Sequence, residues 1–168
     1  MRALVLAGFL LTACLGASPR CDVEVTSDLA FTGSDAHDAV TVRAFGPSCD
    51  KATGLYDIRT ADGEPIWAWS APLPRAFGEV FAANEHDAMR DFLERWAQPV
   101  IATTQNAPAF ETLEPESTTL DRLTYEDLRA RDLPMLCHAS GTRRETCVFW
   151  EPAAGAAGHF YDREAAEP

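Results

Sequence analysis

Polar and apolar residues alternate in segments 22–26 and 39–44, as they do in strands with one buried face. The pattern is interrupted by an Asp62-Gly63 pair between two β-rich runs, which is typical of a hairpin turn. Pro72 ends the pattern because proline cannot donate to a ladder. The sequence therefore predicts a short antiparallel meander, with strands in segments 22–26, 39–44, 54–60 and 65–71.

Two later segments have the period of an amphipathic helix. The first begins after Asn84, which can cap it, and its apolar stripe faces a core; the stripe consists of Met89, Phe92, Leu93 and Trp96. The second is expected to begin at Thr124, where Thr-Tyr-Glu-Asp approximates a capping box, and to end before Pro134. The intervening segment 98–119 has no clear period, so it is either a functional surface excursion or contains a strand that the pattern does not reveal.

The C-terminal part predicts a hairpin of segments 135–139 and 145–150, followed by a last strand at 159–161. The fold class is therefore α+β: a small antiparallel sheet, made of the meander plus the C-terminal hairpin, packed by one or two amphipathic helices. We expect a single domain over residues 21–163 and a frayed tail over 164–168.

The N-terminus has the features of a secretory signal peptide, with Arg2 followed by nine apolar or small residues. The apolar stretch is too short to cross a bilayer. Leu11-Thr12-Ala13-Cys14 resembles the lipobox of bacterial lipoproteins, in which the cysteine is acylated and the chain is cut before it. This resemblance implies that residues 1–13 are removed, that Cys14 carries acyl chains, and that 14–20 is a tether to the membrane. Leu15 after the anchor implies the outer membrane, facing the periplasm, in a Gram-negative cell.

Acylation of Cys14 would explain the odd number of cysteines, because five minus one leaves four thiols for two disulfides in an oxidising compartment. Centring the C-terminal hairpin on Thr142 puts Cys137 opposite Cys147, which favours that bridge and leaves Cys21 to pair with Cys49. Four cysteines nevertheless allow three pairings. Only six residues separate Cys14 from Cys21, so the domain would lie within about 20 Å of the membrane surface.

The composition restricts the classes of partner. The 26 acidic and 14 basic residues give a formal charge of −12, which argues against binding nucleic acid or anionic headgroups and would favour a cationic protein partner. The length is suited to one domain. Removal of residues 1–13 takes away Arg2 and no acidic residue, so the mature charge is −13.

No motif predicts catalysis, a metal or a cofactor. The histidines are scattered without the spacing of a zinc site, which favours structural or surface roles for His37, His86, His138 and His159. Ser48-Cys49-Asp50-Lys51 matches the S-x-x-K of penicillin-recognising enzymes, but Lys51 is the only lysine, so the accompanying K-T-G element is absent.

Four residues are candidates for ligand binding. Trp67 and Trp69 lie two apart in a predicted strand and so point to one face, either as an aromatic platform for a glycan or as core residues covering the first helix, which is the favoured interpretation. Arg143 and Arg144, near the hairpin tip, could bind an anion or simply be solvated.

Three functions follow as hypotheses. The main one is a lipid-anchored, non-enzymatic binding protein or component of the cell envelope. The second is an inhibitor of a cationic enzyme such as lysozyme, because Ser140-Gly141-Thr142-Arg143 is faintly similar to the serine-glycine loop of such inhibitors, although those are β-barrels. The third is a cell-wall glycan-binding module or small hydrolase that uses Trp67 and Trp69.

Overall fold

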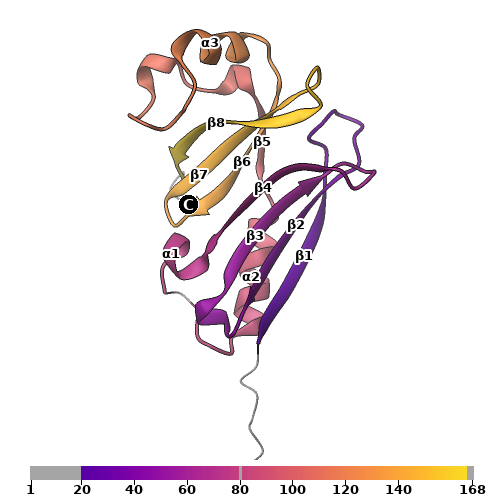
Figure 1. Cartoon of the computed structure of the whole chain (residues 1–168), viewed down its shortest axis with the longest axis vertical. Helices are drawn as coiled ribbons and strands as arrows, with labels where there is room; N and C mark the ends of the chain where they lie inside the picture. The colour runs from indigo at the N-terminus through magenta and orange to yellow at the C-terminus, as the bar shows by residue number, and fades with distance from the viewer. Residues whose placement is uncertain (1–19, 80, 166–168) are drawn as a thin grey trace, which may run out of the picture.

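The computed structural model describes residues 20–79 and 81–165 and contains two antiparallel four-stranded sheets, arranged one beyond the other along the long axis (Figure 1). Each sheet is a meander with its strands in chain order. The first sheet consists of β1 (Cys21–Leu29), β2 (Asp38–Gly46), β3 (Thr53–Arg59) and β4 (Pro65–Pro72). The second consists of β5 (Val100–Thr103), β6 (Pro134–Gly141), β7 (Arg144–Glu151) and β8 (Ala156–Glu164).

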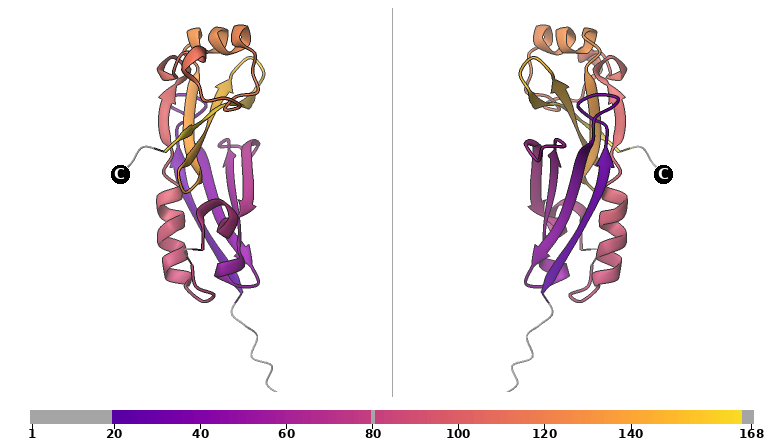
Figure 2. Two further views of the ribbon diagram at one scale, coloured as in Figure 1. Left: turned by 90° about the vertical axis from the view of Figure 1, so that its left-hand side faces the viewer. Right: turned by 90° about the vertical axis from the view of Figure 1, so that its right-hand side faces the viewer.

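Three α-helices complete the fold: α1 (Leu73–Phe77), α2 (His86–Trp96) and α3 (Arg122–Ala130). Helix α2 runs alongside the first sheet against β1 and β2, and α3 lies at the far end of the second sheet (Figure 2). The described chain begins at the opposite end of the molecule. No helix in the described residues has the length and apolarity needed to cross a bilayer.

The α+β class agrees with the structure, but the expectation of one sheet was wrong. The C-terminal hairpin β6–β7 does not join the meander, because β5 and β8 pair with its two sides and complete a second sheet. Strand β5 lies in segment 98–119, for which an unrevealed strand was one of the two alternatives predicted from the sequence. It has only four residues, and Val100 and Ile101 are about half exposed, so no alternating pattern marks it.

The helix boundaries also differ from the predicted ones. Glu85, not Asn84, is the residue before α2, and its carboxylate accepts from the Ala82 N–H at 2.8 Å. Asp121, not Thr124, caps α3, accepting from the Thr124 N–H at 3.0 Å and the Thr124 hydroxyl at 2.9 Å. An aspartate three residues earlier is a stronger cap than the threonine that approximated a capping box.

Both expected disulfides are present in the structure. Cys21 is bonded to Cys49, which ties the start of β1 to the short helix 49–51, and Cys137 is bonded to Cys147, directly opposite it across β6 and β7. The predicted disulfide bonding is therefore confirmed. Cys14 and the remainder of the N-terminal segment up to residue 19 lie outside the described residues.

The two sheets share one core. Leu136 and Val148, from the second sheet, are fully buried among the apolar residues of the first sheet and α2. The opposite face of the second sheet packs against α3, where Tyr125 stacks on Phe160 with ring centroids 4.4 Å apart. Strand β8 extends to Glu164, and the Ala165 N–H donates to the Arg143 carbonyl at 3.0 Å, so the start of the expected frayed tail is hydrogen-bonded.

Candidate functional site

A groove of about 340 Å³ lies where β4 of the first sheet meets β6, β7 and β8 of the second. We call it the tryptophan groove. Helix α2 covers β1 and β2 and leaves the inner face of the edge strand β4 partly open, so side chains from both sheets can line one hollow. Its lining residues are Trp67, Trp69, Ser140, Arg144, Thr146, His159 and Asp162.

Both indoles serve the core and the groove together. Trp69 meets Trp96 of α2 edge-on, with ring centroids 5.6 Å apart, and contacts Phe77 of α1 in the same way. Trp67 donates its indole N–H to Nε2 of His138 at 3.2 Å. Each side chain is partly buried against the core yet lines the groove, so the two interpretations weighed from the sequence are not exclusive. The tryptophans form one wall of a groove and not a flat exposed platform.

Asp162 organises the polar wall opposite. Its carboxylate accepts from Arg144 Nη2 at 2.5 Å and from the Thr146 hydroxyl at 2.7 Å, and His159 Nε2 lies 3.4 Å away. Burial raises the pKa of Asp162, but the hydrogen bonds from His159, Thr146 and Arg144 outweigh burial and lower the pKa to about 2. The carboxylate is therefore charged at neutral pH and balances the Arg144 guanidinium.

Ser140 is not arranged as a nucleophile. Its hydroxyl lies 2.9 Å from that of Thr146, whose proton is committed to the stronger acceptor, the Asp162 carboxylate. The Ser140 hydroxyl donates to the Arg144 carbonyl at 3.5 Å and has no histidine or carboxylate base among its hydrogen-bond partners in the described residues. A serine nucleophile needs such a base within hydrogen-bond reach, so this geometry suits hydrogen bonding to a ligand better than covalent chemistry.

His138 supports the tryptophan wall from behind. It is 1% exposed and stacks on Tyr56 with ring centroids 4.2 Å apart. Because Nε2 accepts from Trp67, the ring carries its proton on Nδ1, which donates to the Ala139 carbonyl at 3.0 Å. Burial lowers the pKa of His138 to about 4, so the ring is neutral and holds Trp67 in one orientation.

We expect the buried His138 to make the free energy of unfolding fall in acid. The unfolded chain takes up a proton near the ordinary pKa of 6.5, whereas the folded chain does so only near 4, so the contribution of neutral His138 is complete above about pH 6.5 and is lost as the pH falls. The loss between pH 6.5 and 4 should be about 3 kcal/mol of the free energy of unfolding. The measurement is urea unfolding across this range.

The control for this prediction is His138→Gln, whose amide oxygen can accept from Trp67 but does not titrate. The difference in unfolding free energy between wild type and variant should shrink as the pH falls. Parallel pH profiles for the two proteins would show that His138 is not the acid-sensitive group.

The two candidate arginines lie in different places. Arg144 lines the tryptophan groove, whereas Arg143 lies outside it at the exposed tip of the β6–β7 hairpin, 3.9 Å from Glu164. The tip is docked on α1, since the Thr142 N–H donates to the Ala76 carbonyl at 3.1 Å. A loop that inserts into an enzyme cleft has to project freely, so this docking does not favour the inhibitor hypothesis.

Four groove residues were not predicted from the sequence to line a ligand site. Ser140 was considered only as part of an inhibitory loop, His159 was assigned a structural or surface role, and Thr146 and Asp162 were not singled out. The structure brings them together because β7 pairs with β8 and Thr146 lies directly opposite Asp162. Arg144 and Thr146 are two residues apart on one strand and so share a face. That spacing was the one sequence signal that could have placed Thr146 beside the candidate Arg144. The position of β8 beside β7 could not be read from a segment of small residues.

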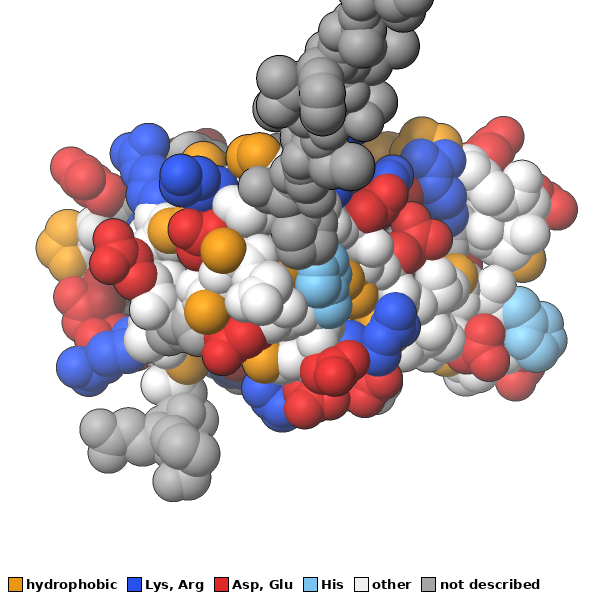
Figure 3. Space-filling view, turned by 90° about the horizontal axis from the view of Figure 1, so that it is seen from below, with side chains coloured by type: hydrophobic (Ala, Val, Ile, Leu, Met, Phe, Trp, Pro, Cys, Tyr) orange, Lys and Arg blue, Asp and Glu red, His pale blue; other side chains and the backbone are white. Residues whose placement is uncertain are grey.

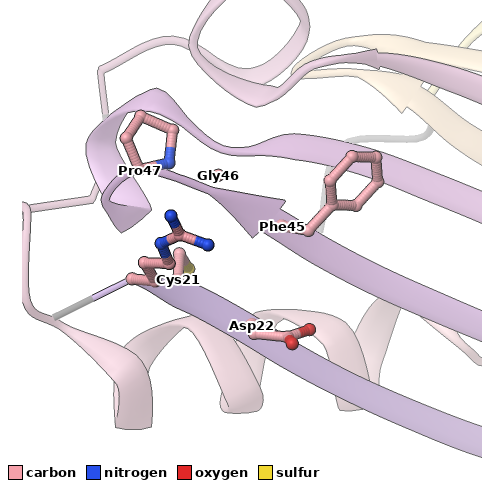
Figure 4. A pocket seen from close by; sticks show the side chains of 6 residues that line it. Cys21, Asp22, Phe45, Gly46 and Pro47 are labelled. Atoms are coloured by element: carbon pink, nitrogen blue, oxygen red, sulfur yellow. The ribbon is translucent and has the colours of Figure 1, made fainter.

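A second hollow of about 400 Å³ lies at the base of the first sheet, near the start of the described chain (Figure 4). Its lining is mostly apolar or backbone, including Phe45, Gly46 and Pro47. The one carboxylate among the described residues of its lining, that of Asp22, forms an ion pair with Arg43, with 2.7 Å between Oδ1 and Nη2. His86 lies near the Cys21–Cys49 bridge, but disulfide sulfurs are not thiolate ligands, so this cluster is not suited to a metal.

No protein-family model, curated protein or solved structure matches this chain. Function is therefore inferred from the geometry of the tryptophan groove, which combines partly exposed aromatic rings, an ion pair and hydroxyl groups. The volume of the groove, about 340 Å³, falls at the lower end of the range of small-ligand sites.

Proposed function

We propose that the protein is a lipid-anchored, non-catalytic binding protein of the cell envelope, which holds a sugar of the cell-wall glycan in the tryptophan groove. The observation that supports this proposal is the meeting of Trp67 and Trp69 with the Arg144–Asp162 ion pair in one hollow. The membrane attachment in this proposal comes from acyl chains on Cys14, and the protein faces the periplasm from the outer membrane of a Gram-negative cell.

The chemistry of the groove suits a sugar ring. An indole presents a flat apolar surface that can stack on the C–H face of a sugar ring, while the hydroxyl groups of the sugar stay in contact with water or polar side chains. Arg144 uses one of its nitrogens on Asp162, and its other N–H groups are free to donate to hydroxyl or acetamido oxygens. The charges of Arg144 and Asp162 balance each other, so the groove suits the neutral, hydroxyl-bearing part of a sugar ring.

A binding role is favoured over the alternatives by the same groups. Among the residues that the structure describes, no histidine or carboxylate is hydrogen-bonded to Ser140, which disfavours a hydrolase, and the docked β6–β7 tip disfavours an inhibitory loop. The strongly acidic composition disfavours nucleic acid as a partner. A cationic envelope protein stays compatible with the acidic net charge.

The proposal predicts selective loss of sugar binding. The test is titration of the detergent-solubilised mature protein with the peptide-free disaccharide of N-acetylglucosamine and N-acetylmuramic acid, followed by calorimetry. Arg144→Ala and Trp67→Ala should each weaken binding at least about tenfold, because each removes a contact worth about 1.4 kcal/mol or more. Near-ultraviolet circular dichroism checks that each variant keeps its packing.

The matched control is Arg143→Ala, which removes the neighbouring arginine of the same hairpin from outside the groove. It should bind the disaccharide as well as the wild type does. Equal losses for the two arginine variants, or no binding of the disaccharide by the wild type, would contradict the proposal.

A further inference from the structure

Another hollow, of about 430 Å³, adjoins the tryptophan groove on the other side of the Arg144–Asp162 ion pair. We call it the charged hollow. The same two residues line both hollows, so the ion pair is the wall between them. Its other lining residues are Glu114, Pro115, Glu116, Ser117, Arg143, Arg163 and Glu164.

The charged hollow presents free groups of both signs. Glu114 and Glu116 are exposed and form no ion pair or side-chain hydrogen bond in the part of the chain that the structure describes. Arg143 has only a long contact with Glu164, 3.9 Å between two side chains that are each about three-quarters exposed. Such a contact contributes little, so Arg143 is available to a ligand. Arg163, by contrast, is committed to Glu145 at 2.7 Å.

The segment that carries Glu114 and Glu116 is hydrogen-bonded to the edge of β8 through the next two residues, Ser117 and Thr118. The Asp162 N–H donates to the Ser117 carbonyl at 2.7 Å, and the Thr118 hydroxyl donates to the Phe160 carbonyl at 2.6 Å. The Ser117 side chain is 6% exposed, and its Oγ has no hydrogen-bond partner within the described residues. A buried hydroxyl without a partner is unfavourable, and a polar ligand group that reaches it would recover that loss.

We propose that the charged hollow binds the short peptide carried by the cell-wall glycan, so that the complete ligand is a glycopeptide with its sugar in the tryptophan groove. This inference rests on the proposed function. A peptide with a free amine and free carboxylates matches the two signs: the amine faces Glu114 and Glu116, and a carboxylate faces Arg143. A second sugar could offer at most the lactyl carboxylate of N-acetylmuramic acid and no amine for Glu114 and Glu116, and the charged hollow is lined by no aromatic ring on which the sugar could stack.

The test compares three ligands on the full mature protein: the peptide-free disaccharide, the same disaccharide carrying its peptide, and a peptide-free tetrasaccharide. The peptide-bearing disaccharide should bind at least about tenfold more tightly than the bare disaccharide, and the tetrasaccharide should show no such gain. Arg143→Ala and Glu116→Gln should each remove most of the gain while leaving the affinity for the bare disaccharide unchanged.

The matched control is Glu111→Gln, a glutamate of the same connecting segment that pairs with Arg122 at 2.9 Å and does not line the charged hollow. It should keep the full gain. Equal affinities with and without the peptide, or tighter binding of the tetrasaccharide than of the peptide-bearing disaccharide, would overturn the inference and leave the sugar site standing. Failure of all three ligands to bind would overturn the proposed function itself.

Discussion

Replacing Trp96 with alanine is expected to lower the free energy of unfolding by about 3–5 kcal/mol, the cost of removing a large buried aromatic side chain. Trp96 is 4% exposed and lies among Tyr56, Trp69, Phe77 and Phe92, with ring centroids 5.4–5.7 Å away. Its indole N–H donates to the Ala139 carbonyl of the second sheet at 2.7 Å. One side chain of α2 therefore joins both sheets.

Chemical denaturation measures this effect, with two variants for comparison. Trp96→Phe keeps an aromatic ring but leaves the Ala139 carbonyl without this donor, and should cost about 1–3 kcal/mol. Leu123→Ala changes a side chain that is 83% exposed and should stay within about 0.5 kcal/mol of the wild type. A loss below about 1 kcal/mol for Trp96→Ala would contradict the shared core between the sheets.

Replacing Cys14 with serine is expected to block maturation, so that the chain keeps residues 1–13 and carries no acyl anchor. Several acyl chains on one residue give stable anchorage, and serine offers no thiol to acylate. On the part of the lower face that the described residues form, hydrophobic side chains are scattered among acidic, basic and other polar ones (Figure 3). The acidic net charge would not attract anionic headgroups.

Fractionation of cells and the mass of the mature chain measure this outcome. The wild type should begin at an acylated Cys14, and globomycin should block its maturation. The matched control is Thr12→Ser, a conservative change within the lipobox-like segment, which should still be processed. A Cys14→Ser protein that stays on the membrane and is processed as the wild type is would contradict lipid anchorage.

The meander was predictable because its strands bury one face and expose the other. Val40, Val42 and Ala44 of β2 are fully buried and their neighbours are not, which is the alternation that the sequence carries. The stripe of α2 was predictable for the same reason, since it packs on a sheet through one side. The Cys137–Cys147 bridge followed from the register of a two-stranded hairpin, which depends on local sequence.

The second sheet was not predictable because its pairings are decided by tertiary contacts. Strand β8 begins with Ala156, Ala157 and Gly158, small residues with no strand pattern. A Cβ at position 158 would lie 2.9 Å from the Phe149 ring, so a larger residue there would force the ring to move. The candidate site depends on that pairing, because Asp162 reaches Thr146 across it. Sequence reasoning therefore found the tryptophans and Arg144 but not the carboxylate that organises them.

The most direct test of the tryptophan groove is the set of indole N–H signals of the protein's four tryptophans, recorded by ¹⁵N nuclear magnetic resonance during titration with the peptide-free cell-wall disaccharide. The signals of Trp67 and Trp69 should shift in a saturable manner, because both rings line the groove. The signal of Trp150, which does not line it, should stay in place. Unchanged Trp67 and Trp69 signals, or an equal shift of Trp150, would contradict sugar binding in the groove.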